Sequence, residues 1–180
     1  CEIETYKSLS MHGFATAREI QGRMGQIDTE VTDLMTSLAE AKQPAETTLS
    51  AVLRHSAELE SLDAKVAFRF AATWAYQAIV DQRIAVLREE RFKGRQTFYE
   101  FMMRRYDPAM RTVKSTETRL STLVDRARRA GELLRTKVDV ERSAQNQALL
   151  ESMDKRADLQ LRLQKTVEGL SVVAISYYAV

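Results

Sequence analysis

Cysteine, proline and glycine are scarce in this chain of 180 residues, which contains one Cys, two Pro and six Gly. The single cysteine, Cys1, excludes a disulfide within the chain and a zinc site built from cysteines. Because proline and glycine mark most turns, their scarcity predicts long helices joined by few loops. The 29% of charged residues and the 7% of aromatic residues agree with this prediction.

The chain also carries little net charge. It has 27 Lys and Arg against 25 Asp and Glu, which gives +2 at pH 7. The basic residues are scattered among acidic ones, as on solvated helix faces. Nucleic-acid binding is therefore not expected.

The motifs of common catalytic and cofactor sites are missing. No glycine-rich phosphate loop occurs, and His12 and His55 lack a second ligand at metal-binding spacing. We therefore predict no catalytic residue, no cofactor, no metal site and no small-molecule substrate. Four glutamates could gather at one end of the predicted helices: Glu2, Glu4, Glu89 and Glu90. A solvated charge cluster is the expectation there, and a divalent-cation site is the alternative.

Apolar and small residues recur at alternating steps of three and four through the first part of the chain. The series is Ile3, Tyr6, Ser10, Gly13, Ala17, Ile20, Met24, Ile27, Val31, Leu34, Leu38 and Ala41. This period of about 3.5 residues is typical of coiled-coil packing. Gln43-Pro44 interrupts the series, and proline suits the first position of a new helix, so we predict a tight turn there.

The same spacing resumes after Pro44. The second series is Leu49, Val52, Ser56, Leu59, Asp63, Val66, Phe70, Thr73, Gln77, Val80, Ile84 and Leu87. If the chain folds back at the proline, facing residues have numbers with a nearly constant sum, so that Ala17 meets Phe70 and Gly13 falls beside Thr73. This agreement in register predicts a long antiparallel hairpin of helices over about 2–42 and 45–90.

The second helix carries further apolar residues outside its series. They are Leu53, Leu62, Phe68, Trp74, Ile79 and Val86. Such a broad apolar surface predicts contact with a third helix. Polar residues interrupt the hairpin seam in the pairs Met24–Asp63 and Ser10–Gln77. We interpret these polar residues as register-setting groups near that third helix or solvent.

Gly94 suits a helix end, and Thr97 with Glu100 forms a capping box, which predicts a short helix over 97–106. Asp107-Pro108 then predicts the start of a helix over 108–180. Its apolar face, which includes Leu149, should pack along the second helix and reach the bend near Met153. The predicted fold class is thus all-α, with a helical bundle over 1–154 and a protruding stalk and the beginning of a membrane span over 155–180.

Apolar residues continue along the third helix beyond the point where it should leave the bundle. They project in several directions and are Leu159, Leu161, Leu163, Val167, Leu170, Val173 and Tyr177. A solvated helix does not favour them, so we predict that they form a self-association or membrane-entry surface. The spacing of the three leucines also fits a strand, although the helix formers around them favour a helix.

Residues 169–180 carry no charge, but the run is shorter than the about 20 apolar residues that cross a bilayer. We interpret it as the beginning of a truncated span. Because the chain begins at Cys1 without an initiator Met, we expect an excerpt of a longer protein. Lys155, Arg156, Arg162 and Lys165 precede the run, which predicts that this region lies on the cytoplasmic side. The alternative is the buried C-terminal helix of a soluble protein.

Both ends of the chain resemble a known family. The segments that carry the resemblance are 2–7, 108–112, 133–140, 151–154 and 164–180. They resemble a bacterial family of uncharacterised, predicted membrane-anchored proteins, a domain of unknown function (thirty-four twenty-two). The resemblance implies a mixed domain before Cys1, membrane spans after the C-terminus and a place at the bacterial inner membrane. The family has no established catalytic residues, so none is carried over.

The leading functional hypothesis is a non-enzymatic helical scaffold that holds a cytoplasmic domain away from a membrane and forms a homo-oligomer. The alternative is the cytoplasmic stalk of an oligomeric cation transporter or channel, because the plan of soluble domain, long helix and membrane hairpin is similar to that of bacterial magnesium channels. A soluble, partner-binding helical bundle is a second alternative. A ring with residues 155–180 at its axis would favour transport.

Overall fold

The protein is built from three helices. The computed structural model describes the backbone of residues 2–178 and the side chains of residues 2–163. The helices are α1 (Glu2–Ala39), α2 (Ala45–Val86) and α3 (Phe98–Tyr178). No strand occurs among residues 2–178, so the predicted all-α fold class is confirmed. The chain divides into two compact units, Cys1–Leu134 and Arg135–Val180.

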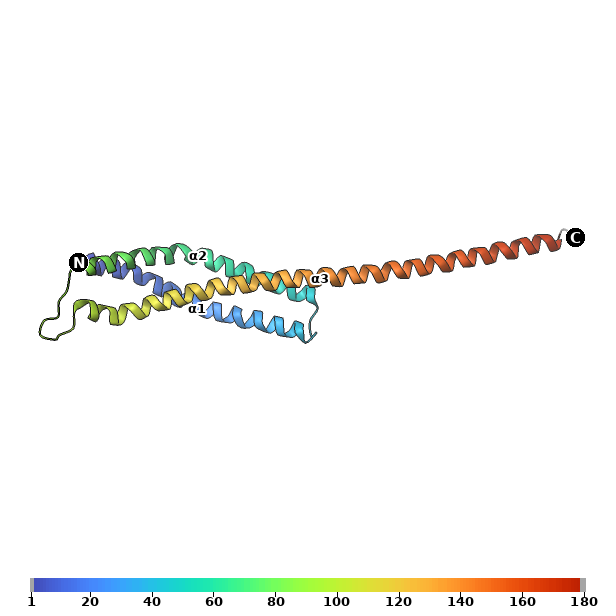
Figure 1. The fold of residues 1–180 in the computed structure, drawn as a ribbon. Coiled ribbons are helices and arrows are strands. Elements are labelled where there is room, and N and C mark those ends of the chain that lie inside the picture. Colours follow the sequence, from blue (N-terminus) through green and yellow to red (C-terminus); the bar gives the residue numbers. More distant parts are fainter. Residues whose placement is uncertain (1, 179–180) are drawn as a thin grey trace. The chain divides into compact units, whose positions relative to one another are not determined.

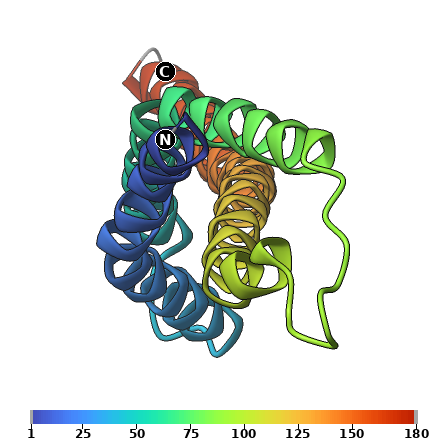
Figure 2. The ribbon, with the colours of Figure 1, turned by 90° about the vertical axis from the view of Figure 1, so that its left-hand side faces the viewer.

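The first two helices lie side by side in opposite directions (Figures 1 and 2). The rings of Tyr6 and Tyr76 stack with their centroids 6.0 Å apart, and Lys65 Nζ lies 3.2 Å from Glu19 Oε1. The two pairs have similar sums of residue numbers, as an antiparallel pair requires. The predicted hairpin is therefore confirmed, and its turn ends at Pro44, the residue before α2.

Within Cys1–Leu134, the first part of α3 lies along the hairpin and runs parallel to α1 (Figure 2). Three α1–α3 hydrogen bonds join residues 96, 95 and 98 positions apart: Ser10–Tyr106, Gln21–Thr116 and Asp28–Arg126. A nearly constant difference is the expected register of two parallel helices. Side chains from all three helices form one core cluster, whose largest fully buried members include Phe70, Met24, Ile27, Leu59 and Leu120.

The predicted seam of α1 is confirmed. All of the buried residues of α1 belong to the predicted series: Ile3, Ser10, Gly13, Ala17, Ile20, Met24, Ile27 and Val31. Most of the buried residues of α2 belong to the second series: Val52, Leu59, Val66, Phe70, Thr73, Val80 and Ile84. The register of one helix against the other could therefore be read from spacing alone.

At the start of α2 the buried face differs from the prediction. Thr48 and His55 are buried, whereas Leu49 and Ser56 are only partly buried. Here α2 meets α3 as well as α1, in a second apolar cluster that centres on Val52 and includes side chains of both neighbours. The additional contact turns the buried face of α2 by one residue.

The predicted contact of α2 with the third helix is present, since Trp74 Nε1 donates to Glu117 Oε2 over 3.2 Å, but not all the apolar residues outside the α2 series take part in it. Phe68 is 81% exposed and Val86 is 69% exposed. Phe68 lies two residues from Val66 and from Phe70, which is about 200° around a helix, so it points away from the core that both neighbours occupy. The polar seam position Asp63 is exposed as well.

Three helix boundaries differ from the predicted ones. α1 and α2 end before residues 42 and 90, and Ala41 and Arg88 follow with left-handed φ angles of 54° and 43°. The capping box forms: Glu100 N donates to Thr97 Oγ1 over 3.2 Å, and Thr97 N donates to Glu100 Oε2 over 3.3 Å. The predicted break before Pro108 does not occur.

The continuous helix passes through Pro108 because of where that residue lies. Proline removes one backbone N–H and thereby leaves the carbonyl of Arg104 without its helical partner. Both residues are exposed, so water can satisfy this carbonyl. Tyr106 and Met110 are buried on the other face and hold the direction of the helix across the defect.

The helices α1 and α2 approach each other closely at Gly13. A Cβ atom built on this glycine would lie 2.1 Å from Thr73 Oγ1 and 2.9 Å from Thr73 Cβ. Thr73 Oγ1 donates to Arg69 O over 2.8 Å, and the side chain is buried. The helices can therefore approach this closely only because residue 13 has no side chain.

We expect Gly13→Ala to lower the free energy of unfolding by about 1–3 kcal/mol, because the added methyl group must displace a buried, hydrogen-bonded threonine. Gly22→Ala is the matched control on the same helix, since a Cβ atom there has no neighbour within 4 Å. That control should gain about 0.5–1 kcal/mol from helix propensity. Urea unfolding followed by circular dichroism measures both changes, and equal effects would contradict the proposed close contact.

Candidate functional site

The predicted self-association or membrane-entry surface is only partly described. Leu159, Leu161 and Leu163 lie on α3 and are 60%, 58% and 65% exposed. Four further predicted residues lie outside the described side chains: Val167, Leu170, Val173 and Tyr177. The three leucines are therefore helical and accessible in a single chain.

The sequence reading missed four more exposed apolar residues in the same unit. Val140, Leu149, Leu150 and Met153 are 63%, 60%, 62% and 63% exposed. The assignment of Leu149 to the packed face is wrong, because α3 begins at Phe98, ten residues before the predicted start. At about 1.5 Å per residue, a helix that starts earlier also passes the end of the hairpin at a lower residue number. The last buried described residue of α3 is Val138. The capping box of Thr97 and Glu100 is the sequence feature that marks the start of α3 at Phe98.

Four of these side chains share one side of α3. At about 100° per residue, Leu149, Met153, Leu159 and Leu163 fall within roughly 120° of the helix circumference. We name these four residues the apolar stripe. Leu161 lies outside it, about 200° from Leu163.

The polar groups of this segment are mostly placed elsewhere on the helix. Asp158 and Arg162 form an i, i+4 ion pair with 3.7 Å between Oδ2 and a guanidinium nitrogen. By the same helical geometry, this pair lies opposite Leu149. Ser152, Arg156 and Gln160 are exceptions, because they interrupt the apolar stripe.

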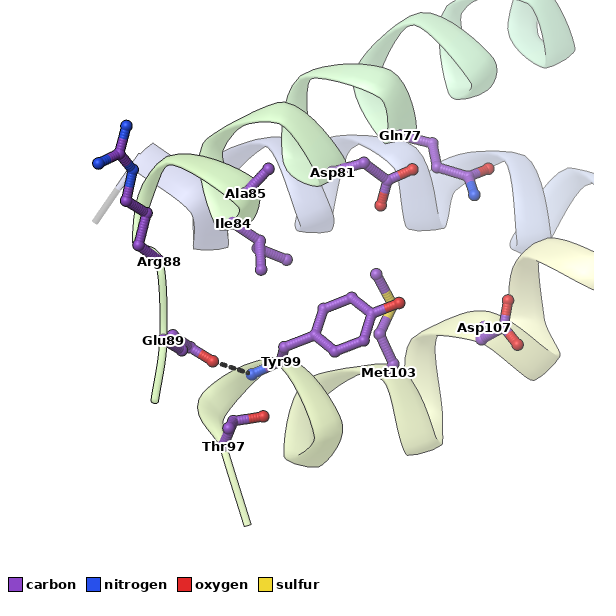
Figure 3. A pocket seen from close by; sticks show the side chains of 10 residues that line it. All are labelled: Gln77, Asp81, Ile84, Ala85, Arg88, Glu89, Thr97, Tyr99, Met103 and Asp107. Carbon is purple, nitrogen blue, oxygen red and sulfur yellow. Dashed lines mark hydrogen bonds between the residues drawn. The ribbon is translucent and has the colours of Figure 1, made fainter. Parts of the chain in front are cut away.

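A separate cavity of about 560 Å³ lies in the unit Cys1–Leu134, where α2 ends and α3 begins (Figure 3). It is lined by Gln77, Asp81, Ile84, Ala85, Arg88, Glu89, Thr97, Tyr99, Met103 and Asp107. Asp81 on α2 and Asp107 on α3 contribute carboxylates from its two sides (Figure 3). Glu89 Oε2 accepts a hydrogen bond of 2.9 Å from Tyr99 N, which ties the loop to the start of α3.

Three of the four glutamates considered as a cation site, Glu2, Glu4 and Glu89, have other partners. Glu2 pairs with Arg83 over 3.0 Å, and Glu4 pairs with Lys7 over 2.7 Å. Among the described residues, no group of three or more His, Cys, Asp or Glu side chains is placed to hold a metal ion. His12 is exposed, and His55 is buried with Nδ1 3.5 Å from a Glu30 oxygen.

The comparison with protein families bears on the whole chain. The model of a family described as "Protein of unknown function (DUF3422)" matches residues 1–180. The chain belongs to this family. No curated protein and no solved structure matches the DUF3422 chain. Family membership confirms the resemblance seen in the sequence, and it assigns no activity.

In the part of the chain that the structure describes, no helical segment combines the length and the apolar character that a membrane span requires. The charge-free run that suggested the start of a span, residues 169–180, lies outside the described side chains.

The cavity of the DUF3422 chain disfavours the charged form of Asp81. Burial raises the pKa of Asp81, and the negative charge of Asp107 raises it further. Asp107 has a partner of its own, because Arg111 lies 2.7 Å from its Oδ2. The paired carboxylates can therefore hold a proton or receive a cationic group.

The neighbouring hydroxyl of Tyr106 has a structural role. Ser10 Oγ donates to Lys7 O over 2.7 Å, so its single hydrogen is used and the Tyr106 hydroxyl donates to Ser10 Oγ over 2.8 Å. Burial raises the pKa of Tyr106. The pair links α1 to α3 through a satisfied buried contact.

We expect Asp81→Asn to stabilise the protein at pH 7 and to have little effect at pH 3. The raised pKa means that the folded state disfavours the ionised carboxyl, so stability falls as the pH rises through the pKa range of Asp81. Thermal unfolding from pH 3 to pH 7 measures the change. Asp63→Asn is the control on the same helix, because Asp63 is exposed, and a matching pH dependence there would contradict the role of the paired carboxylates.

Proposed function

We propose that the chain is a non-enzymatic helical scaffold that associates with a second copy of itself through the apolar stripe of α3. The observation that carries this proposal is the exposure of Leu149, Met153, Leu159 and Leu163 on one side of a helix, each about three-fifths accessible. Apolar side chains gathered on a helix face are stabilised when another helix covers them. Every copy of the chain presents the same stripe.

A second copy suits the stripe because one surface can cover its own equivalent in a twofold pair. Ser152, Arg156 and Gln160 interrupt the apolar residues, and polar residues within such a seam specify register at some cost in stability. The Asp158–Arg162 ion pair on the other side keeps a solvated face. These features favour a helix pair over burial within a larger core.

The proposal includes attachment to the bacterial inner membrane through the C-terminal end. Its support is in the sequence: residues 169–180 carry no charge, and basic residues precede them. In this scheme the bundle lies on the cytoplasmic side of that membrane. Self-association and membrane attachment are separate steps, and the first can be tested without lipid.

We expect Leu163→Glu to weaken self-association of the full chain by more than tenfold, because a charge replaces an apolar side chain in the stripe. Leu161→Glu is the matched control, since it makes the same change two residues away at a similarly exposed position outside the stripe. Sedimentation equilibrium gives the dissociation constants, and circular dichroism checks that both variants stay helical. A monomeric wild-type chain, or equal weakening by both substitutions, would overturn the proposed interface.

A further inference from the structure

Exposed apolar residues also gather around the connection between α2 and α3. They are Val86, Leu87, Phe92, Phe98, Tyr99 and Phe101, and their exposed fractions run from 45% to 72%. Phe92 is the most exposed of them. We name residues 86–105 the loop segment. Isolated exposed apolar residues need no explanation, but six within one short segment mark an interaction surface.

The loop segment is also basic. It contains six basic residues, Arg88, Arg91, Lys93, Arg95, Arg104 and Arg105, against three acidic ones, Glu89, Glu90 and Glu100. Arg91 pairs with Glu100, and Lys93 Nζ lies 5.4 Å from the centre of the Phe92 ring. In the described part of the chain, no ion pair engages Arg95, Arg104 or Arg105. The charges of the segment are thus largely available to a partner.

The backbone of the loop presents Phe92 at the edge of a tight turn. Arg95 N donates to Phe92 O over 3.0 Å, and Lys93 and Gly94 between them have φ angles of 50° and 73°. The left-handed region suits glycine, but a lysine there is strained. Arg88 is a second basic residue in this region, with φ at 43°.

We propose that the loop segment docks on an anionic lipid surface, with Phe92 in the boundary between headgroups and acyl chains and the neighbouring Lys93 and Arg95 at the lipid phosphates. Charge complementarity identifies this occupant, because the segment has twice as many basic as acidic residues. Apolar rings between basic side chains are the composition that binds such an interface. This surface is independent of the apolar stripe and of residues 169–180.

The test compares Phe92→Trp with Phe68→Trp in the full chain. Phe68 is 81% exposed and lies near Lys65 and Arg69 on α2, so it controls for an accessible aromatic ring beside basic residues. Vesicles contain brominated phosphatidylcholine, with or without phosphatidylglycerol as the anionic lipid. We expect brominated lipid to quench the tryptophan at position 92 but not the one at position 68, above the background of Trp74. Quenching should require the anionic lipid and fall in about 1 M salt, where the Debye length is about 3 Å.

This measurement is local to the loop, so vesicle binding by another part of the chain does not produce it. A chain that floats with the vesicles while position 92 stays unquenched would overturn the proposal. Equal quenching with purely zwitterionic vesicles would also overturn it, as would a complete lack of binding. The last result, with wild-type self-association intact, would leave the proposed stripe interface standing.

Lys93→Gly gives a second test in which stability and binding change differently. Glycine adopts the φ of this position without strain, so the variant should fold at least as stably as the wild type. Losing the charge should weaken the anion-dependent binding about fivefold. Lys42→Gly in the other connection is the control and should leave that binding unchanged. A Lys93→Gly variant that binds as well as the Lys42→Gly control would contradict the role of the loop charges.

Discussion

The close approach of α1 and α2 at Gly13 is the constraint on which the bundle depends. With no side chain at residue 13, buried Thr73 can lie against the backbone of α1. Its hydroxyl still donates to the carbonyl of Arg69 within α2. This contact fixes the distance between the helices, and the antiparallel register then places matching seam residues opposite each other. Native density in a helix interface depends on such pairs of small and larger residues.

The third helix packs along the groove between α1 and α2. Its apolar side chains join the core cluster, while polar contacts set its position along α1: Tyr106 donates to buried Ser10, and Arg126 reaches Asp28 over 2.8 Å. Trp74 adds a hydrogen bond of 3.2 Å from α2 to a carboxylate oxygen of Glu117. Apolar burial can tolerate small shifts along a helix axis, whereas these directional bonds cannot. The register of α3 is therefore held by both kinds of contact.

The surfaces that we associate with function lie where this packing stops. The connection between α2 and α3 has a loop that no seam covers, and its aromatic and basic side chains are exposed together. The helix beyond residue 138 has no buried described side chain, and its apolar stripe remains accessible. The cavity beside the connection contains the carboxylates of Asp81 and Asp107, and burial together with the negative charge of Asp107 raises the pKa of Asp81. Structural contacts account for the bundle, but they do not account for these exposed groups.

The sequence by itself determined the all-α class, the position of the bend at Pro44 and the register of α1 against α2, because a repeated seam on two adjoining segments admits few alignments. Only the tertiary structure decided that Phe68 points to solvent and which side chains of α3 pair with those of the hairpin, since both depend on where the third helix lies. It also decided that α3 passes through Pro108. A local proline signal predicts a break, but exposure of the affected carbonyl and burial of the opposite face outweigh it.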